Sequence, residues 1–257
     1  MKKILILQIL LLILMIVILI SCGRHKIKPN LSAEERMKRA EEMFNDGDYL
    51  DARTQFRIII LNSPGGSLSD KAQFYYAECH FNLKEYILAI AEYEKLVRRY
   101  PNSEYVDDAQ YKVGLSNYKL SPKSALDQTY TEKAIEEFQK FLEDYSNSAL
   151  VPKVNEYMRK CRDKLAQKNF KSGESYRKRA LYRSALIYYD FVLDNFYDTK
   201  YAERSLWAKA ECYRRMGELE QAEKFYKLYL EKYPKSSKVD KIKDLLSSIK
   251  TNDNDNH

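Results

Sequence analysis

Apolar side chains follow two patterns along this 257-residue chain. The first is a continuous block, because residues 4–20 are apolar except for Gln8. Further on, apolar positions recur every three or four residues, the spacing that lines one face of an α-helix. The whole chain contains only 7 Gly and 6 Pro, so few residues interrupt this second pattern. The sequence therefore predicts an all-α protein behind an apolar N-terminal segment. One clear example of the helical spacing is Val239, Ile242, Leu245, Leu246 and Ile249.

The helical region repeats itself, and alanines mark the register. The five equivalent alanines lie 37, 45, 51 and 37 residues apart, which is a period of 37 with insertions of eight and fourteen residues. Each has an aromatic residue four positions later, and three have a proline twelve positions later. A small residue stands twelve positions earlier in the repeats without the eight-residue insertion. The five alanines are Ala52, Ala89, Ala134, Ala185 and Ala222.

This spacing indicates pairs of antiparallel helices. A small residue on the first helix facing the alanine of the second allows close approach. We expect the aromatic residue to fill the space toward the next repeat. Proline ends the second helix, and Gly47 and Gly217 fall in the turn between helices, where left-handed backbone angles are needed. Each pair leaves an apolar face that the next pair must cover, so the pattern predicts a solenoid.

The pattern contains two small positions, one aromatic position, a proline and a glycine turn. It resembles the tetratricopeptide repeat. We interpret the chain as a solenoid of about five such helix pairs over residues 32–250, followed by a polar, disordered tail at 251–257. A 22–31 linker precedes the solenoid. The predicted repeats span residues 32–64, 68–101, 105–146, 151–197 and 201–234, with a capping helix at 236–250.

The N-terminal block is typical of a secretory signal, because Lys2 and Lys3 precede the apolar segment and Ser21 precedes Cys22. Leu19-Ile20-Ser21-Cys22 looks like a bacterial lipobox. We therefore predict that residues 1–21 are removed and that Cys22 is lipidated, which places the mature chain outside the cytoplasm. An uncleaved N-terminal anchor is the alternative. Position 23 is Gly and not the Asp of an inner-membrane retention signal, so the outer membrane is a possible location for the lipidated chain.

Charge is concentrated in one stretch of the repeat region. Residues 151–179 hold ten Lys or Arg against three acidic residues, whereas the whole chain has a net charge of +7. This stretch could steer an acidic protein surface, or it could be a solvated helix face. An exported protein rarely meets nucleic acid, so we expect no nucleic-acid partner.

The sequence contains no recognisable catalytic, cofactor or metal motif. Pro64-Gly65-Gly66 lacks the Lys-Ser/Thr of a phosphate loop, and no G-x-S-x-G elbow is present. Cys79, Cys161 and Cys212 are odd in number and form no C-x-x-C pair, which argues against disulfides and zinc. We expect the three cysteines to be packed in the core and the protein not to be an enzyme.

The eight-residue insertion carries a more specific signal. Ser121-Pro122 leads into Asp127-Gln128-Thr129-Tyr130-Thr131, and the acidic amphipathic segment Glu132–Tyr145 follows. With the lipobox and the five repeats, this arrangement is similar to the BamD family, the lipoproteins of the outer-membrane β-barrel assembly machine. The resemblance covers essentially all of the mature chain.

The resemblance implies a lipid-anchored scaffold on the periplasmic face of the outer membrane. Its C-terminal repeats would dock the barrel-forming core subunit, and its N-terminal repeats would receive unfolded outer-membrane proteins. Tyr75, Tyr76 and Phe81 are candidates for an aromatic groove, although packing between repeats explains them equally well. The alternatives are another repeat lipoprotein, such as a secretin pilotin or a cell-envelope or division coordinator, and a lipoprotein hydrolase, for which no nucleophile–base pair is found.

Overall fold

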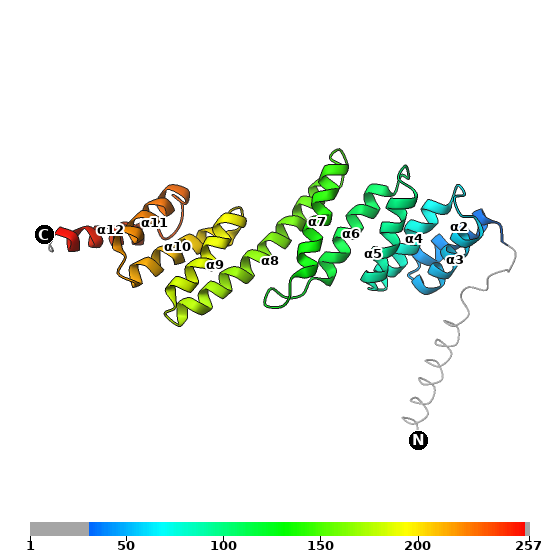
Figure 1. Cartoon of the computed structure of the whole chain (residues 1–257). Helices are drawn as coiled ribbons and strands as arrows, with labels where there is room; N and C mark the ends of the chain where they lie inside the picture. Colours follow the sequence, from blue (N-terminus) through cyan, green and yellow to red (C-terminus); the bar gives the residue numbers. More distant parts are fainter. Residues whose placement is uncertain (1–30, 255–257) are drawn as a thin grey trace, which may run out of the picture.

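The computed structural model describes residues 31–254, and the predicted signal peptide and Cys22 lie outside this range. Within it the chain forms eleven α-helices and no strand, which confirms the all-α prediction. Consecutive helices pack side by side in an elongated array (Figure 1). The helices are α2 (Ala33–Asn45), α3 (Tyr49–Asn62), α4 (Ser69–Asn82), α5 (Tyr86–Arg99), α6 (Val106–Leu120), α7 (Thr129–Asp144), α8 (Val151–Lys178), α9 (Tyr182–Asn195), α10 (Lys200–Arg215), α11 (Leu219–Lys232) and α12 (Val239–Asn254).

The five register alanines are completely buried, as are the five aromatic residues that follow them. The turn inside four of the pairs is three residues long and needs one left-handed residue. Gly47 and Gly217 adopt φ angles of +84° and +78° there, as the sequence predicts, while Lys84 and Ala180 occupy the equivalent positions with φ of 62° and 58°. Glycine is therefore favoured in this turn but is not required.

The space beside each small residue is filled differently from the sequence-based expectation. A Cβ atom added to Gly173 would lie 2.6 Å from Cε1 of Tyr189, and one added to Gly114 would lie 2.6 Å from the ring of Phe138. The small residue therefore accommodates the aromatic ring of its own helix pair. The prediction that this ring fills the space toward the next repeat did not include its contact with the small residue on the first helix of its own pair.

Serines in the loops after the second helices hold three of the five pairs through hydrogen bonds. Ser103 donates to Asp70, and Ser148 donates to Asp107, both at 2.7 Å between oxygens. Ser236 donates to Glu203 at 2.7 Å. In each case the acidic residue lies in the first turn of the first helix of the same pair. These bonds hold the chain where it leaves one pair and enters the next.

The two insertions take different forms. The eight-residue insertion adds five residues to the turn between α6 and α7, which becomes the loop of residues 121–128, and lengthens the adjoining helix ends, whereas the fourteen-residue insertion extends α8 to 28 residues. Figure 1 shows α8 running between the N-terminal and C-terminal pairs. α12 continues to Asn254, four residues beyond the predicted end of the capping helix at 250, and no Gly or Pro in 251–254 interrupts it.

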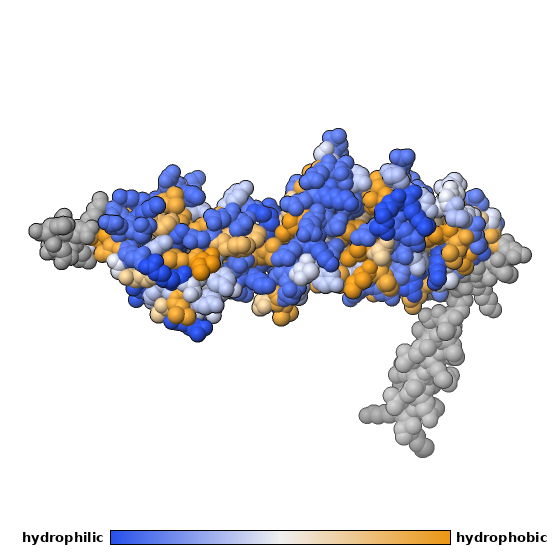
Figure 2. All heavy atoms as spheres, viewed as in Figure 1, coloured by the Kyte–Doolittle hydropathy of each residue, from blue (hydrophilic) through white to orange (hydrophobic). Residues whose placement is uncertain are grey.

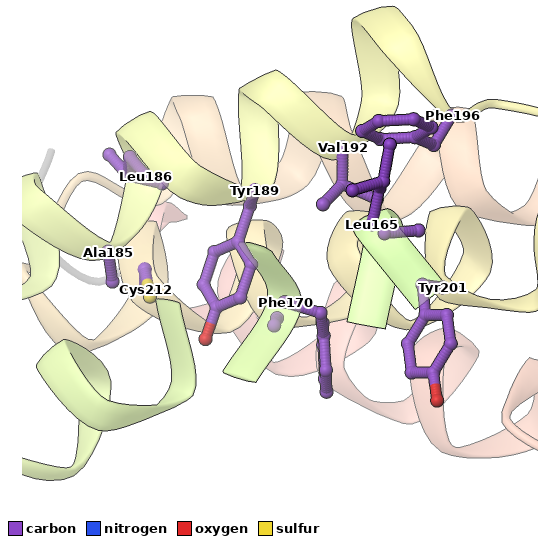
Figure 3. Packing of buried hydrophobic residues seen from close by; sticks show 11 residues of the cluster. Leu165, Phe170, Ala185, Leu186, Tyr189, Val192, Phe196, Tyr201 and Cys212 are labelled. Atoms are coloured by element: carbon purple, nitrogen blue, oxygen red, sulfur yellow. The ribbon is translucent and has the colours of Figure 1, made fainter. Parts of the chain in front are cut away.

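The core is a series of clusters between neighbouring pairs. In one of them the rings of Tyr189, Phe170 and Tyr201 lie in a row, with centroid separations of 5.9 Å and 5.7 Å (Figure 3). Cys79, Cys161 and Cys212 are buried and free, as expected for core residues. Hydrophilic residues dominate the visible surface over α7 (Figure 2). None of the helices within residues 31–254 has the length and apolar character that crossing a bilayer requires.

Candidate partner-binding pocket in the last two repeats

The three predicted groove residues do not share one surface. Tyr75 stacks on Phe56 at 5.5 Å and is half-buried between the first two pairs. Tyr76 contacts His80 edge-on at 4.9 Å and lines a separate cavity of about 280 Å³. Phe81 packs between the second and third pairs, where Lys112 lies 4.4 Å from its ring centre. Since successive helix residues are rotated by about 100°, Tyr75 and Tyr76 cannot point the same way.

A more coherent site lies between the last two pairs and α12. This C-terminal pocket has a volume of about 320 Å³. α8 and α10 contribute side chains from the same positions of the repeat: an aromatic residue, then a glutamate four residues later. Lys241 of α12 and Lys238, which directly precedes that helix, close the row. The lining residues are Phe170, Glu174, Arg177, Arg204, Trp207, Ala208, Glu211, Lys238 and Lys241.

The two glutamates of the pocket are held by the scaffold. Glu174 accepts hydrogen bonds from Arg177 at 2.8 Å and from Tyr189 at 2.6 Å. Glu211 accepts in the same way from Arg214, at 2.9 Å, and from Tyr226. Burial alone would raise the pKa of both carboxyl groups, but these hydrogen bonds outweigh it and the pKa of each is lowered. Both glutamates are therefore anionic at neutral pH, with their charges already partnered.

The remaining cations of the pocket lie over aromatic rings. The Arg204 guanidinium is 4.4 Å from the ring centre of Phe170, and the Lys241 ammonium is 5.1 Å from that of Trp207. Lys238 lies 5.7 Å from the same Trp207 ring. Among the described residues none of these three cations forms an ion pair. The pocket lining thus carries four cations against two carboxylates, a net positive charge above an aromatic floor, which suits an acidic segment that also carries apolar side chains.

The pocket was missed from the sequence although its signal is present. Phe170-x-x-x-Glu174-x-x-Arg177 recurs as Trp207-x-x-x-Glu211-x-x-Arg214, exactly 37 residues on. The second pair carries only part of it, since Phe74 and Glu78 are followed by Phe81. Lys238 and Lys241 could not be assigned from the repeat, because α12 has no partner helix to define its register.

Within residues 31–254 no group of three His, Cys, Asp or Glu residues could hold a metal ion. Part of the basic stretch 151–179 is compensated: Arg162 pairs with Asp198, Lys160 with Glu156 and Arg177 with Glu174. Steering of an acidic protein surface and a solvated helix face both stay predictions for this stretch.

Paired helices in a 37-residue register, with a charged aromatic pocket formed by equivalent positions, define a tetratricopeptide-type helical-repeat protein. The chain belongs to the YfiO family, described as outer membrane lipoproteins, whose model matches residues 29–228.

Curated relatives are similar over most of their length. The outer membrane protein assembly factor BamD of Vibrio cholerae is 21% identical over 201 residues, covering 74% of this chain and 83% of that protein. BamD of Rickettsia prowazekii is 23% identical over 188 residues, covering 73% and 75%. BamD of Neisseria meningitidis is 23% identical over 221 residues, covering 82% and 83%.

Solved helical-repeat structures are more distant. The TPR2AB domain of yeast Sti1 in its pHSP90 complex has a TM-score of 0.43 and 14% identity, covering 79% of this chain and 78% of that chain. A thermophilic TPR protein of Thermus thermophilus has a TM-score of 0.38 and 19% identity, covering 85% and 98%.

Proposed function

We propose that this protein is a lipid-anchored scaffold for outer-membrane protein assembly, and that its C-terminal pocket docks the barrel-forming core subunit. The observation that supports this most directly is the set of three cations above Phe170 and Trp207 that form no ion pair within the described part of the chain. The similarity to BamD assembly factors supplies the cellular process.

The chemistry of the pocket favours recognition of a folded or extended protein segment. Its aromatic floor offers apolar contact area, and Arg204 and Lys241 offer charge that an acidic partner residue would neutralise. Because Glu174 and Glu211 are fixed by hydrogen bonds, the pocket needs little reorganisation on binding. A rigid, charged pocket of this kind supports docking and gives no group a catalytic role.

Reception of unfolded outer-membrane proteins is proposed for the N-terminal repeats. Tyr76, Arg53 and Arg57 line the cavity of about 280 Å³ there, together with His80. Phe81 and Tyr75 contribute to packing between the pairs and so shape this end without forming a single exposed stripe. Lipidation of Cys22 and attachment at the periplasmic face of the outer membrane remain proposals that rest on the lipobox.

Affinity purification of the full-length protein from detergent-solubilised envelopes tests the docking proposal. We expect the barrel-forming core subunit to co-purify with the wild-type protein and to be lost with Arg204→Glu/Lys241→Glu. Lys140→Glu/Lys232→Glu changes the charge equally at two exposed positions of α7 and α11 and should retain the subunit. Recovery of a secretin or a peptidoglycan synthase in its place would support the alternative, a pilotin or cell-envelope coordinator.

A further inference from the structure

A second cavity lies at the junction of the insertion loop, α8 and the start of α10. Its volume is about 520 Å³, and five of its ten lining residues are lysines against a single aspartate. We call it the basic cavity. Its lining residues are Tyr118, Lys123, Ser124, Lys160, Asp163, Lys164, Gln167, Lys171, Lys200 and Tyr201.

The positive charge of the basic cavity is largely uncompensated. Lys160 pairs with Glu156 at 2.6 Å, outside the lining. Among the described residues no carboxylate pairs with Lys123, Lys171 or Lys200. Lys164 is half-buried and donates at 2.6 Å to the hydroxyl of Ser121, a neutral group. Burial lowers the pKa of Lys164, as expected for an ammonium without a counter-charge.

Two neutral features add donors at the same place. Ser124 is only 7% exposed, lines the cavity, and its hydroxyl has no hydrogen-bond partner within the described part of the chain. Lys200 and Tyr201 are the first two residues of the 16-residue helix α10, and the Thr199 side chain does not cap their amides. Free amides and the positive end of a helix dipole favour a bound anion. The loop, α8 and α10 therefore each contribute positive charge or hydrogen-bond donors that favour a bound anion.

We propose that the basic cavity is a binding site for a multiply charged phosphate group, carried by a lipid headgroup or by a free phosphate ester. All five of its cations are lysines, whose ammonium groups act as point charges and can approach the several oxygens of one phosphate from different sides. The C-terminal pocket, in contrast, uses arginine beside its carboxylates. Several lysines around one cavity place more charge together than a single carboxylate needs.

Calorimetric titration of the full-length protein in detergent tests this inference. The probes are inorganic pyrophosphate, dihexanoyl phosphatidic acid and a hexaglutamate peptide. Lys123→Gln/Lys171→Gln removes two exposed charges without breaking an ion pair of the described chain. Lys140→Gln/Lys232→Gln removes the same charge at exposed positions elsewhere. We expect both phosphate probes to bind the wild type about tenfold more tightly than they bind the cavity variant. Their affinity for the control variant should equal their affinity for the wild type.

The relative affinities of the two phosphate probes distinguish the sources: tighter phosphatidic acid indicates a lipid headgroup, and tighter pyrophosphate indicates a soluble phosphate. Ser124→Ala should weaken both further, because it removes a hydroxyl donor without changing charge. The proposal is overturned if neither phosphate probe binds, if the control loses as much affinity as the cavity variant, or if hexaglutamate binds more tightly than both phosphates.

Discussion

The contact between Gly173 and Tyr189 gives the sharpest test of how these helix pairs pack. Tyr189 is completely buried, and its ring leaves a Cβ on residue 173 only 2.6 Å from Cε1. Gly173→Ala must therefore shift the ring or separate α8 from α9. Overpacking of this kind costs about 1–3 kcal/mol. Alanine regains up to about 1 kcal/mol of helix propensity, so the net loss of stability is about 0–2 kcal/mol.

A double-mutant cycle isolates the steric cost. In a Tyr189→Leu background the ring is gone, so Gly173→Ala should stabilise by about 1 kcal/mol through helix propensity alone. The propensity contribution cancels across the cycle, and the coupling energy between positions 173 and 189 should be about 1–3 kcal/mol. Ala210 occupies the equivalent position in the next pair and lies in the same buried cluster as Tyr226, so the fold accommodates a Cβ there, which limits the expected cost.

Urea denaturation followed by far-UV circular dichroism measures the four proteins. Repeat arrays can unfold pair by pair, so the curves should be fitted together with tyrosine fluorescence before free energies are compared. A coupling energy below about 0.3 kcal/mol would refute the reasoning, because it lies within the additivity expected of independent sites. Such a result would mean that the small residues are not needed to make room for the aromatic rings.

Three further outcomes follow from the turns, the cysteines and the buried glutamates. Gly217→Ala should cost about 1–2 kcal/mol in urea denaturation, since φ is +78° and no neighbouring atom lies within 4 Å of the added Cβ; no loss would rule out backbone strain as the cause. Burial raises the pKa of Cys212 to about 12, so mass spectrometry should find this thiol unlabelled by maleimide at pH 7.5 until the protein unfolds. Although burial opposes it, hydrogen bonds from Arg214 and Tyr226 lower the pKa of Glu211 below its ordinary 4.5, so its contribution is present above pH 4.5 and is lost as pH falls through the folded-state pKa. Glu211→Gln should accordingly flatten the acid-induced loss of stability, and parallel profiles for the two proteins would contradict this assignment.

The sequence predicts the fold well because equivalent positions in every helix pair meet the same physical requirements. A position such as that of Ala89 requires a small residue, because two helices cross there. The left-handed turn favours glycine, as at Gly47, at the same position of different pairs. The contact partner of the small residue was harder to predict. Spacing places Gly173 and Ala185 opposite one another, but only the direction of the Tyr189 side chain reveals which group fills the gap.

The candidate site was less predictable, because it depends on which helix faces meet. Tyr75, Tyr76 and Phe81 lie close in sequence but contact different neighbours around α4, and their role in a groove stays a prediction. Trp207 and Lys241 lie on helices that are separated by α11, and their contact arises from the way α12 returns to the row of first helices. The basic cavity likewise joins Lys123, Lys171 and Lys200 from three elements.

Site-specific photo-cross-linking in cells tests the central claim most directly, which is that the C-terminal pocket docks the barrel-forming core subunit. A benzophenone amino acid would replace Trp207 in the pocket and, in a matched control, the exposed Ile187 on α9. The account predicts a cross-link to the core subunit from position 207 that disappears with Arg204→Glu/Lys241→Glu, and none from position 187. Equal cross-linking from both positions, or none from position 207 in a protein that folds normally, would contradict it.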